Sequence, residues 1–135
     1  MTSSPHALLS RDAIEYNFNH LKRISYGAKV MCAVKGNAYG HGITEIVNSL
    51  ENTDGFVVAR LSEARLLRKM KVKLPITLLG GFIDVGELAQ AIDLQCDAFL
   101  CEDSHLSERH YAPKQPHTEK LCLFWLLLLV FDVLL

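Results

Sequence analysis

The sequence predicts an α/β fold built from successive strand–helix units. Short apolar runs start near residues 30, 56, 76 and 97, about twenty to twenty-six residues apart. One segment with helical periodicity separates each pair of runs, which is the rhythm of βα units with right-handed crossovers. This rhythm alone allows two architectures, an open doubly wound sheet or the first half of a (β/α)8 barrel.

Each predicted element rests on a local pattern. Ser10 can act as the N-cap of a helix over about residues 11–25, and Asp84 with Glu87 can open the last helix as a capping box. The strands are expected at residues 29–34, 56–59, 76–79 and 98–101. The apolar stripes of the four predicted helices are Ile14, Phe18, Leu21 and Ile24; Ile43, Ile46, Val47 and Leu50; Leu61, Ala64, Leu66 and Leu67; and Val85, Leu88, Ala89 and Ile92.

Length and composition limit the classes of protein. A chain of 135 residues is long enough for one domain and too short for two, whereas a complete eight-stranded barrel needs about 250 residues. Fourteen basic and fifteen acidic side chains, without a long run of either sign, argue against nucleic-acid binding. The amino terminus lacks the pattern of a signal peptide, so we expect a cytoplasmic protein.

Cysteines and histidines give no support for a metal site. The four cysteines form no CxxC pair, which argues against both a disulfide framework and a zinc site and indicates reduced thiols. His105 and His110 are five positions apart and would not share a helical face. The predicted set of metal ligands is therefore empty.

The most informative segment is Ala-Val-Lys-Gly-Asn-Ala-Tyr-Gly-His-Gly, residues 33–42. Lys35 follows an apolar strand, so it would lie at the carboxyl end of the sheet, where α/β proteins build ligand sites. Desolvation there would lower the pKa of the lysine, and the free amine can form a Schiff base with a carbonyl compound. Glycines at 36, 40 and 42 permit positive φ angles. An ordinary strand-to-helix turn with a surface lysine is the alternative interpretation.

The same segment closely resembles the cofactor-lysine signature of alanine racemases, Val-Lys-Ala-Asn-Ala-Tyr-Gly-His-Gly, with Gly36 in place of the commoner alanine. Residues 54–64 and 75–82 extend the resemblance, which covers about residues 8–109. It favours the barrel, so we predict the N-terminal half of a (β/α)8 TIM-type barrel with about four βα units. It also implies an isomerase that depends on pyridoxal 5'-phosphate (PLP) and interconverts L- and D-alanine.

The resemblance assigns roles to two residues. It implies pyridoxal 5'-phosphate bound as an internal aldimine to Lys35, which would also serve as one of the two acid–base groups. It implies a hydrogen bond from Tyr39 to the cofactor phosphate. Around them, Asn37 is expected to brace the loop and His41 to help start the next helix. Arg60 could face the site or pair with Glu63 on the surface, and we do not count it as catalytic.

A composition break near residue 110 divides the chain. We predict a partial barrel domain over residues 1–109 and a divergent polar linker with an apolar tail over residues 110–135. The apolar run of residues 121–135, interrupted by Asp132, is shorter than the roughly 20 residues of a membrane-spanning helix, so a membrane anchor is disfavoured. Such a tail would either cover an exposed sheet edge or promote aggregation.

The resemblance also implies what a complete enzyme needs beyond this chain. In alanine racemases the second base is a tyrosine of a β-rich domain, contributed across a homodimer interface, and no segment here matches it. We therefore expect the polypeptide to be inactive alone. Two alternatives remain at this stage: another PLP enzyme on the same barrel, such as an amino-acid decarboxylase, or a non-catalytic PLP-binding or interaction protein.

Overall fold

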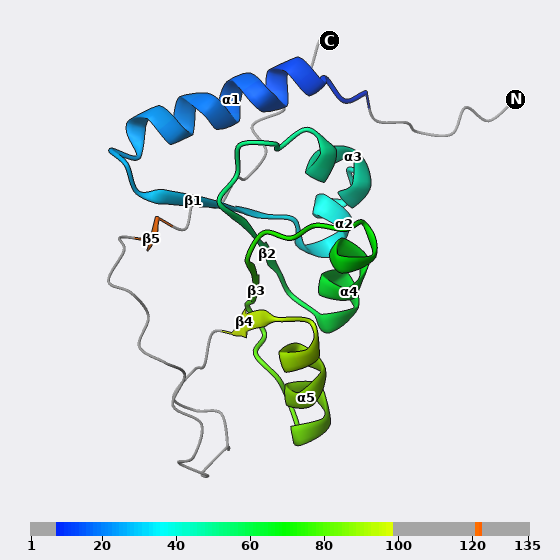
Figure 1. The fold of residues 1–135 in the computed structure, drawn as a ribbon. Helices are drawn as coiled ribbons and strands as arrows, with labels where there is room; N and C mark the ends of the chain where they lie inside the picture. Colours follow the sequence, from blue (N-terminus) through cyan, green and yellow to red (C-terminus); the bar gives the residue numbers. More distant parts are fainter. Residues whose placement is uncertain (1–7, 99–120, 123–135) are drawn as a thin grey trace, which may run out of the picture.

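The strands form one parallel sheet. The structure, a computed structural model, describes residues 8–98 and 121–122. The sheet has the order β4-β3-β2-β1-β5, and every pairing in it is parallel (Figure 1). The strands are β1 Lys29–Ala33, β2 Gly55–Val58, β3 Ile76–Leu78, β4 Cys96–Ala98 and β5 Leu121–Cys122. The first four follow the chain order across the sheet, which confirms the predicted succession of βα units.

Helices connect β1 to β2, β2 to β3 and β3 to β4, and one helix precedes β1. They are α1 Arg11–Ile24, α2 Lys35–Tyr39, α3 Ile43–Asn48, α4 Leu61–Lys69 and α5 Val85–Asp93. The predicted caps are present, because the Ser10 hydroxyl accepts a hydrogen bond from the Ala13 amide (3.3 Å) and the Asp84 carboxylate accepts one from Glu87 (2.8 Å). The predicted fourth strand begins two residues earlier than expected, at Cys96, and its residues 99–101 lie outside the described part of the chain.

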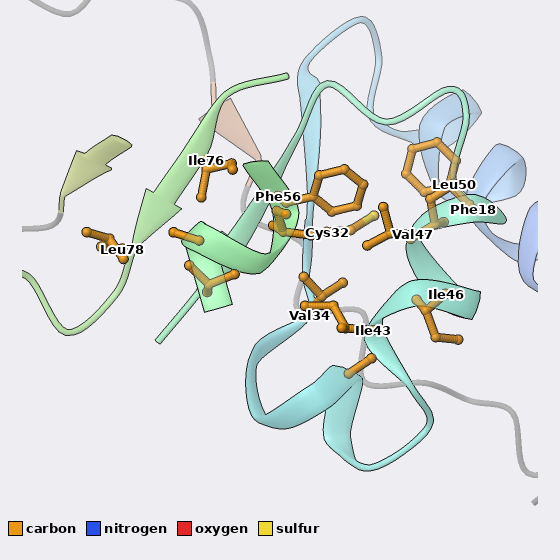
Figure 2. Packing of buried hydrophobic residues seen from close by; sticks show 14 of the residues in the cluster. Phe18, Cys32, Val34, Ile43, Ile46, Val47, Leu50, Phe56, Ile76 and Leu78 are labelled. Atoms are coloured by element: carbon orange, nitrogen blue, oxygen red, sulfur yellow. The ribbon is translucent and has the colours of Figure 1, made fainter. Parts of the chain in front are cut away.

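One large apolar cluster joins the helices to the sheet. Alternate residues of a strand point to opposite faces, and one set of alternate residues in β1, β2 and β3 meets the helices. Figure 2 shows side chains of this cluster between the strands and the helices. Its strand members include Val30, Cys32, Phe56, Ile76 and Leu78. The opposite face carries a smaller buried cluster of Met31, Ala33 and Val57.

The predicted helical stripes are only partly the buried ones. The predicted stripe of residues 43–50 is buried throughout, although its last member, Leu50, lies beyond the end of α3. Ile14 and Phe18 of α1 are buried as well. In α1 and α4, two residues predicted to be buried are exposed instead. Ile24, the last residue of α1, is 45% exposed, and Leu66 of α4 is 40% exposed. At Ile24 the helix ends and the chain turns towards β1, and Leu66 lies next to Leu67, which takes the core-facing position.

The predicted buried side of α5 is wrong, because contacts with other elements decide which side faces the core. Val85 is 72% exposed and Ile92 48% exposed, Ala89 is also exposed, and Leu88 is half-buried. Ala91, outside the predicted stripe, is the buried residue of this helix. Apolar residues occupy more than one side of α5, so periodicity does not single out a face. Contacts with α4 and β4 select the side that carries the small alanine.

The strand β5 lies on the free edge of β1. Lys29 and Val30 pair with Leu121 and Cys122, on the side of β1 opposite to β2. The apolar tail was expected either to cover an exposed sheet edge or to promote aggregation. Leu121 and Cys122 cover a sheet edge. The rest of the tail lies outside the described residues. Within the described part of the chain, no helix has the length and apolar character needed to cross a bilayer.

Two polar side chains tie the elements together. The Asp54 carboxylate accepts hydrogen bonds from the Val30 amide (2.7 Å) and the Lys22 ammonium (2.9 Å), and so links β1 to α1. Partial burial opposes ionisation of Asp54, but these two bonds outweigh it and lower the pKa of the carboxyl. The Arg68 guanidinium donates to four backbone carbonyls, at Val72, Leu74, Leu94 and Gln95, and so links the carboxyl ends of α4 and α5.

Two neighbouring leucines of α4 test this packing. Leu67 is fully buried and Leu66 is 40% exposed. We expect Leu67→Ala to lower the free energy of unfolding by about 2–5 kcal/mol, because it leaves a cavity against the sheet. The matched control, Leu66→Ala, should cost about 1 kcal/mol or less. Urea denaturation followed by circular dichroism measures both, and equal losses would contradict the described orientation of α4.

Candidate active site

A cleft lies at the carboxyl ends of the first two strands. Lys35 follows β1, and Ala59 and Arg60 follow β2, so the adjacent parallel strands deliver them to one edge of the sheet. The cleft has a volume of about 390 Å³. It is lined by Lys35, Gly36, Tyr39, Ala59, Arg60 and Glu63. The structure therefore brings together the two residues that the sequence singled out, Lys35 and Tyr39.

The chain leaves β1 through a left-handed turn. Gly36, Asn37, Ala38 and Tyr39 have φ angles of 62°, 56°, 52° and 56°. The left-handed conformation costs about 1–2 kcal/mol for each residue with a Cβ atom, although asparagine tolerates it better than most. Four consecutive residues in this conformation, one of them a glycine, make one turn of opposite hand to an ordinary helix. The sequence predicted positive φ angles at Gly36, Gly40 and Gly42, which is confirmed. It did not predict them for the residues from Asn37 to Tyr39.

Hydrogen bonds hold this turn in place. The Asn37 side-chain oxygen accepts from the Ile43 amide (2.9 Å), which confirms the expected bracing of the loop and ties the turn to the start of α3. His41 donates from Nδ1 to the Ala38 carbonyl (2.9 Å), a contact within the loop, and its expected role in starting the next helix stays a prediction. The Ala38 amide donates to Val34 (2.9 Å), and Gly40 donates to Gly36 (2.9 Å).

Glu63 is a residue of the cleft that sequence analysis did not identify. One carboxylate oxygen accepts from the Gly36 amide (2.6 Å), and the other accepts from the amides of Ala59 (2.8 Å) and Arg60 (3.1 Å). The contact between Glu63 and Arg60 therefore involves the backbone of Arg60, whereas the sequence allowed a pairing of their side chains. The sequence did contain a signal, because a glutamate three residues after the N-cap, here Arg60, is typical of a capping box.

The cysteine nearest to the lysine along the chain is not a nucleophile. Burial raises the pKa of the Cys32 thiol to about 11, and its side chain belongs to the helix-facing core. A thiol with so high a pKa stays protonated near neutral pH and is unreactive. Cys96 is half-buried and free. Among the described residues no group of three or more His, Cys, Asp or Glu side chains could hold a metal ion, and His105 and His110 lie outside them.

Fold and cleft together define an α/β domain of successive parallel βα units, with a lysine-lined cleft at the carboxyl ends of its strands. Comparison with known families agrees with this class. The chain belongs to the family described as alanine racemase, N-terminal domain, whose model matches residues 9–123. This membership favours the alanine racemase family over the decarboxylases that the sequence left as an alternative. The match passes the composition break near residue 110, and the division into residues 1–109 and 110–135 stays a prediction.

Individual relatives are similar over this same part. An alanine racemase from Shewanella piezotolerans is 37% identical over 106 residues, which are 78% of this chain and 30% of that protein. The solved alanine racemase of Acinetobacter baumannii has a TM-score of 0.63 at 34% identity and covers 65% of this chain and 25% of its own. That of Bartonella henselae, with covalently bound pyridoxal phosphate, has a TM-score of 0.58 at 30% identity, with coverages of 63% and 24%.

These similarities confirm the predicted half-barrel fold. They also show its extent, because the chain spans 30% of the length of the Shewanella relative and about a quarter of each solved structure.

Asn37 tests how the left-handed turn is held. We expect Asn37→Ala to lower the free energy of unfolding by about 1–2 kcal/mol, because it removes the acceptor for Ile43 and places an alanine at a positive φ. Asn37→Asp keeps an oxygen acceptor and should lose clearly less. Urea denaturation of both variants measures the difference. Identical losses would show that the side-chain hydrogen bond does not stabilise the turn.

Proposed function

We propose that this chain supplies the coenzyme-lysine part of an alanine racemase active site, with Lys35 as the point of covalent attachment for pyridoxal 5'-phosphate. The observation that carries the proposal is the placement of Lys35 and Tyr39 in one cleft at the carboxyl ends of β1 and β2. Membership of the family supports it, as does the coenzyme bound covalently to the Bartonella henselae relative.

The residues of the cleft fit this coenzyme. A volume of about 390 Å³ lies within the roughly 300–1,000 Å³ of small-molecule sites. Lys35 supplies an amine, the Tyr39 phenol supplies a hydrogen-bond donor, and Arg60 adds positive charge for a phosphate. Gly36 has no side chain, and a Cβ atom added there would meet no atom within 4 Å, so the backbone is open to a ligand on that side.

We assign distinct tasks to the two residues. The coenzyme, when bound, withdraws electrons from the Cα–H bond of an attached amino acid. The Lys35 amine holds or returns the proton on one face of that carbon, as a general base and acid. Tyr39 anchors the phosphate by donating a hydrogen bond from its phenol. Alanine is the proposed substrate, by analogy with the named activity of the relatives.

The second half of the site lies, in this proposal, outside the chain. Racemisation needs a second acid–base group on the opposite face of the substrate carbon. The family resemblance implies that this group comes from a β-rich domain of a partner subunit, and this chain spans 30% of the length of the Shewanella relative. We therefore infer a homodimer for the complete family protein and no racemisation by this polypeptide alone. The cytoplasmic location stays a prediction.

Attachment of the coenzyme tests the proposal directly. The protein is mixed with pyridoxal phosphate, reduced with borohydride and digested, and the modified lysine is mapped. We expect Lys35 to carry the adduct and Lys35→Ala to remove it, because the primary amine is the attacking group. Lys73→Ala changes an exposed lysine remote in sequence from the cleft and serves as the control. Stoichiometric attachment that survives Lys35→Ala would refute the assignment.

The same experiment examines Tyr39. Tyr39→Phe keeps the ring and removes the donor, so we expect attachment at Lys35 to need a higher coenzyme concentration, by about tenfold, as for a hydrogen bond to a charged group. An unchanged concentration dependence would show that the phenol does not hold the phosphate.

Racemisation is the second test. Incubation of the purified protein with pyridoxal phosphate and L-alanine should form no D-alanine above a protein-free blank, since proton transfer on the opposite face has no partner. A complete alanine racemase under the same conditions provides the positive control. Sustained D-alanine formation by this chain would disprove the inference that the site is incomplete.

A further inference from the structure

We propose that Glu63 is a positioning residue that holds the turn carrying Lys35 against the end of the second strand. The inference rests on the proposed function of Lys35, since it concerns the same cleft. Nothing in the lysine signature includes this residue, which lies 27 positions from Gly36 along the chain. What identifies it is the use of its two carboxylate oxygens.

The carboxylate joins two loops that follow neighbouring strands. Its Oε1 accepts from the Gly36 amide at 2.6 Å, in the loop after β1. Its Oε2 accepts from the amides of Ala59 at 2.8 Å and Arg60 at 3.1 Å, in the loop after β2. Hydrogen bonds to an ionised carboxylate are stronger than neutral ones, and three donors share this one. Glu63 is half-buried and its bond to Ala59 is partly buried, whereas its bonds to Gly36 and Arg60 are exposed.

The bond to Gly36 acts on the lysine through the backbone. The Gly36 amide belongs to the peptide group that joins Lys35 to Gly36, so fixing that N–H fixes the plane of the peptide on the carboxyl side of the lysine Cα. A planar peptide leaves only φ and ψ to orient the residue. Gly36 also begins the left-handed turn, where glycine adopts several backbone conformations at similar energy. An external acceptor for its amide selects one of them.

An equivalent glutamate in the next unit separates this role from ordinary helix capping. Glu87 occupies in α5 the position that Glu63 occupies in α4, three residues after the N-cap. Its carboxylate accepts from the Ile83 amide at 2.8 Å, just before its own helix. In the described part of the chain, the hydrogen bonds of Glu87 stay at the start of its own helix. The carboxylate of Glu63 accepts in addition from the Gly36 amide, in the preceding βα unit.

The test compares Glu63→Gln with Glu87→Gln in the full chain. Glutamine keeps the shape but offers one acceptor oxygen and one NH₂ group, which would face a backbone N–H and cannot accept from it. The single oxygen satisfies two donors if it faces Ala59 and Arg60 but only one if it faces Gly36, so we expect Glu63→Gln to lose the bond to Gly36. Two readouts are measured: amide hydrogen exchange of residues 35–42, and the share of borohydride-trapped pyridoxal phosphate on Lys35 relative to the surface lysines in the same sample.

We expect Glu63→Gln to speed exchange of the Gly36 amide about tenfold or more and to lower the Lys35 share severalfold. Glu87→Gln should leave both readouts within about twofold of the wild type, although both variants lose a helix-start hydrogen bond of similar strength. Comparison with Glu87→Gln therefore controls for a general loss of stability. Should Glu63→Gln fail to fold, Glu63→Asp, which keeps the charge and shortens the reach, takes its place with the same expectation.

Three results would overturn the proposal: equal effects of the two glutamine variants, unchanged exchange at Gly36 in Glu63→Gln, or faster exchange with an unchanged share of adduct on Lys35. A different result concerns the proposed function. If the wild-type chain attaches no coenzyme at Lys35, the assignment of that lysine fails, and the exchange of Gly36 alone decides whether Glu63 holds the turn.

Discussion

The candidate site depends on a turn of the hand that L-amino acids disfavour, placed directly after the first strand. Three residues with a Cβ atom, Asn37, Ala38 and Tyr39, have φ between 52° and 56°. Such strain persists only where surrounding contacts outweigh it. Here the outweighing contacts come from three directions: from within the loop at His41, from the start of α3 at Ile43, and from Glu63. The turn brings Lys35 and Tyr39 to the same cleft.

The rest of the described chain forms a rigid support for this turn. The helices pack their apolar sides on one face of the parallel sheet (Figure 2), and strand residues such as Val57, Val58 and Leu78 are fully buried. Asp54 and Arg68 connect elements through backbone atoms, so the register of strands and helices depends on polar bonds as well as on burial. Sites on rigid elements hold their groups more accurately than sites on long loops.

The division of a racemase site between chain segments follows from its chemistry. Two acid–base groups must lie on opposite faces of one carbon atom, and one sheet edge presents groups from one side. In the proposed function, the cleft between β1 and β2 would supply the lysine side, in a chain that covers 30% of the length of the Shewanella relative. The β5 pairing shows a further property of this chain, because Leu121 and Cys122 occupy the edge of β1 that a closed barrel gives to its last strand.

Local chemistry was enough to predict the order of strands and helices, the caps at Ser10 and Asp84, and the lysine motif, because each depends on residues within a few positions of one another. The tertiary structure alone decided the buried side of α5, the left-handed turn after Lys35 and the partners of Glu63. The physical reason is that local sequence does not determine the outcome. Apolar residues on two sides of a helix, and a carboxylate able to accept from several amides, have alternatives of similar energy, and the left-handed turn is disfavoured locally. Contacts between segments as far apart as Gly36 and Glu63 select among them.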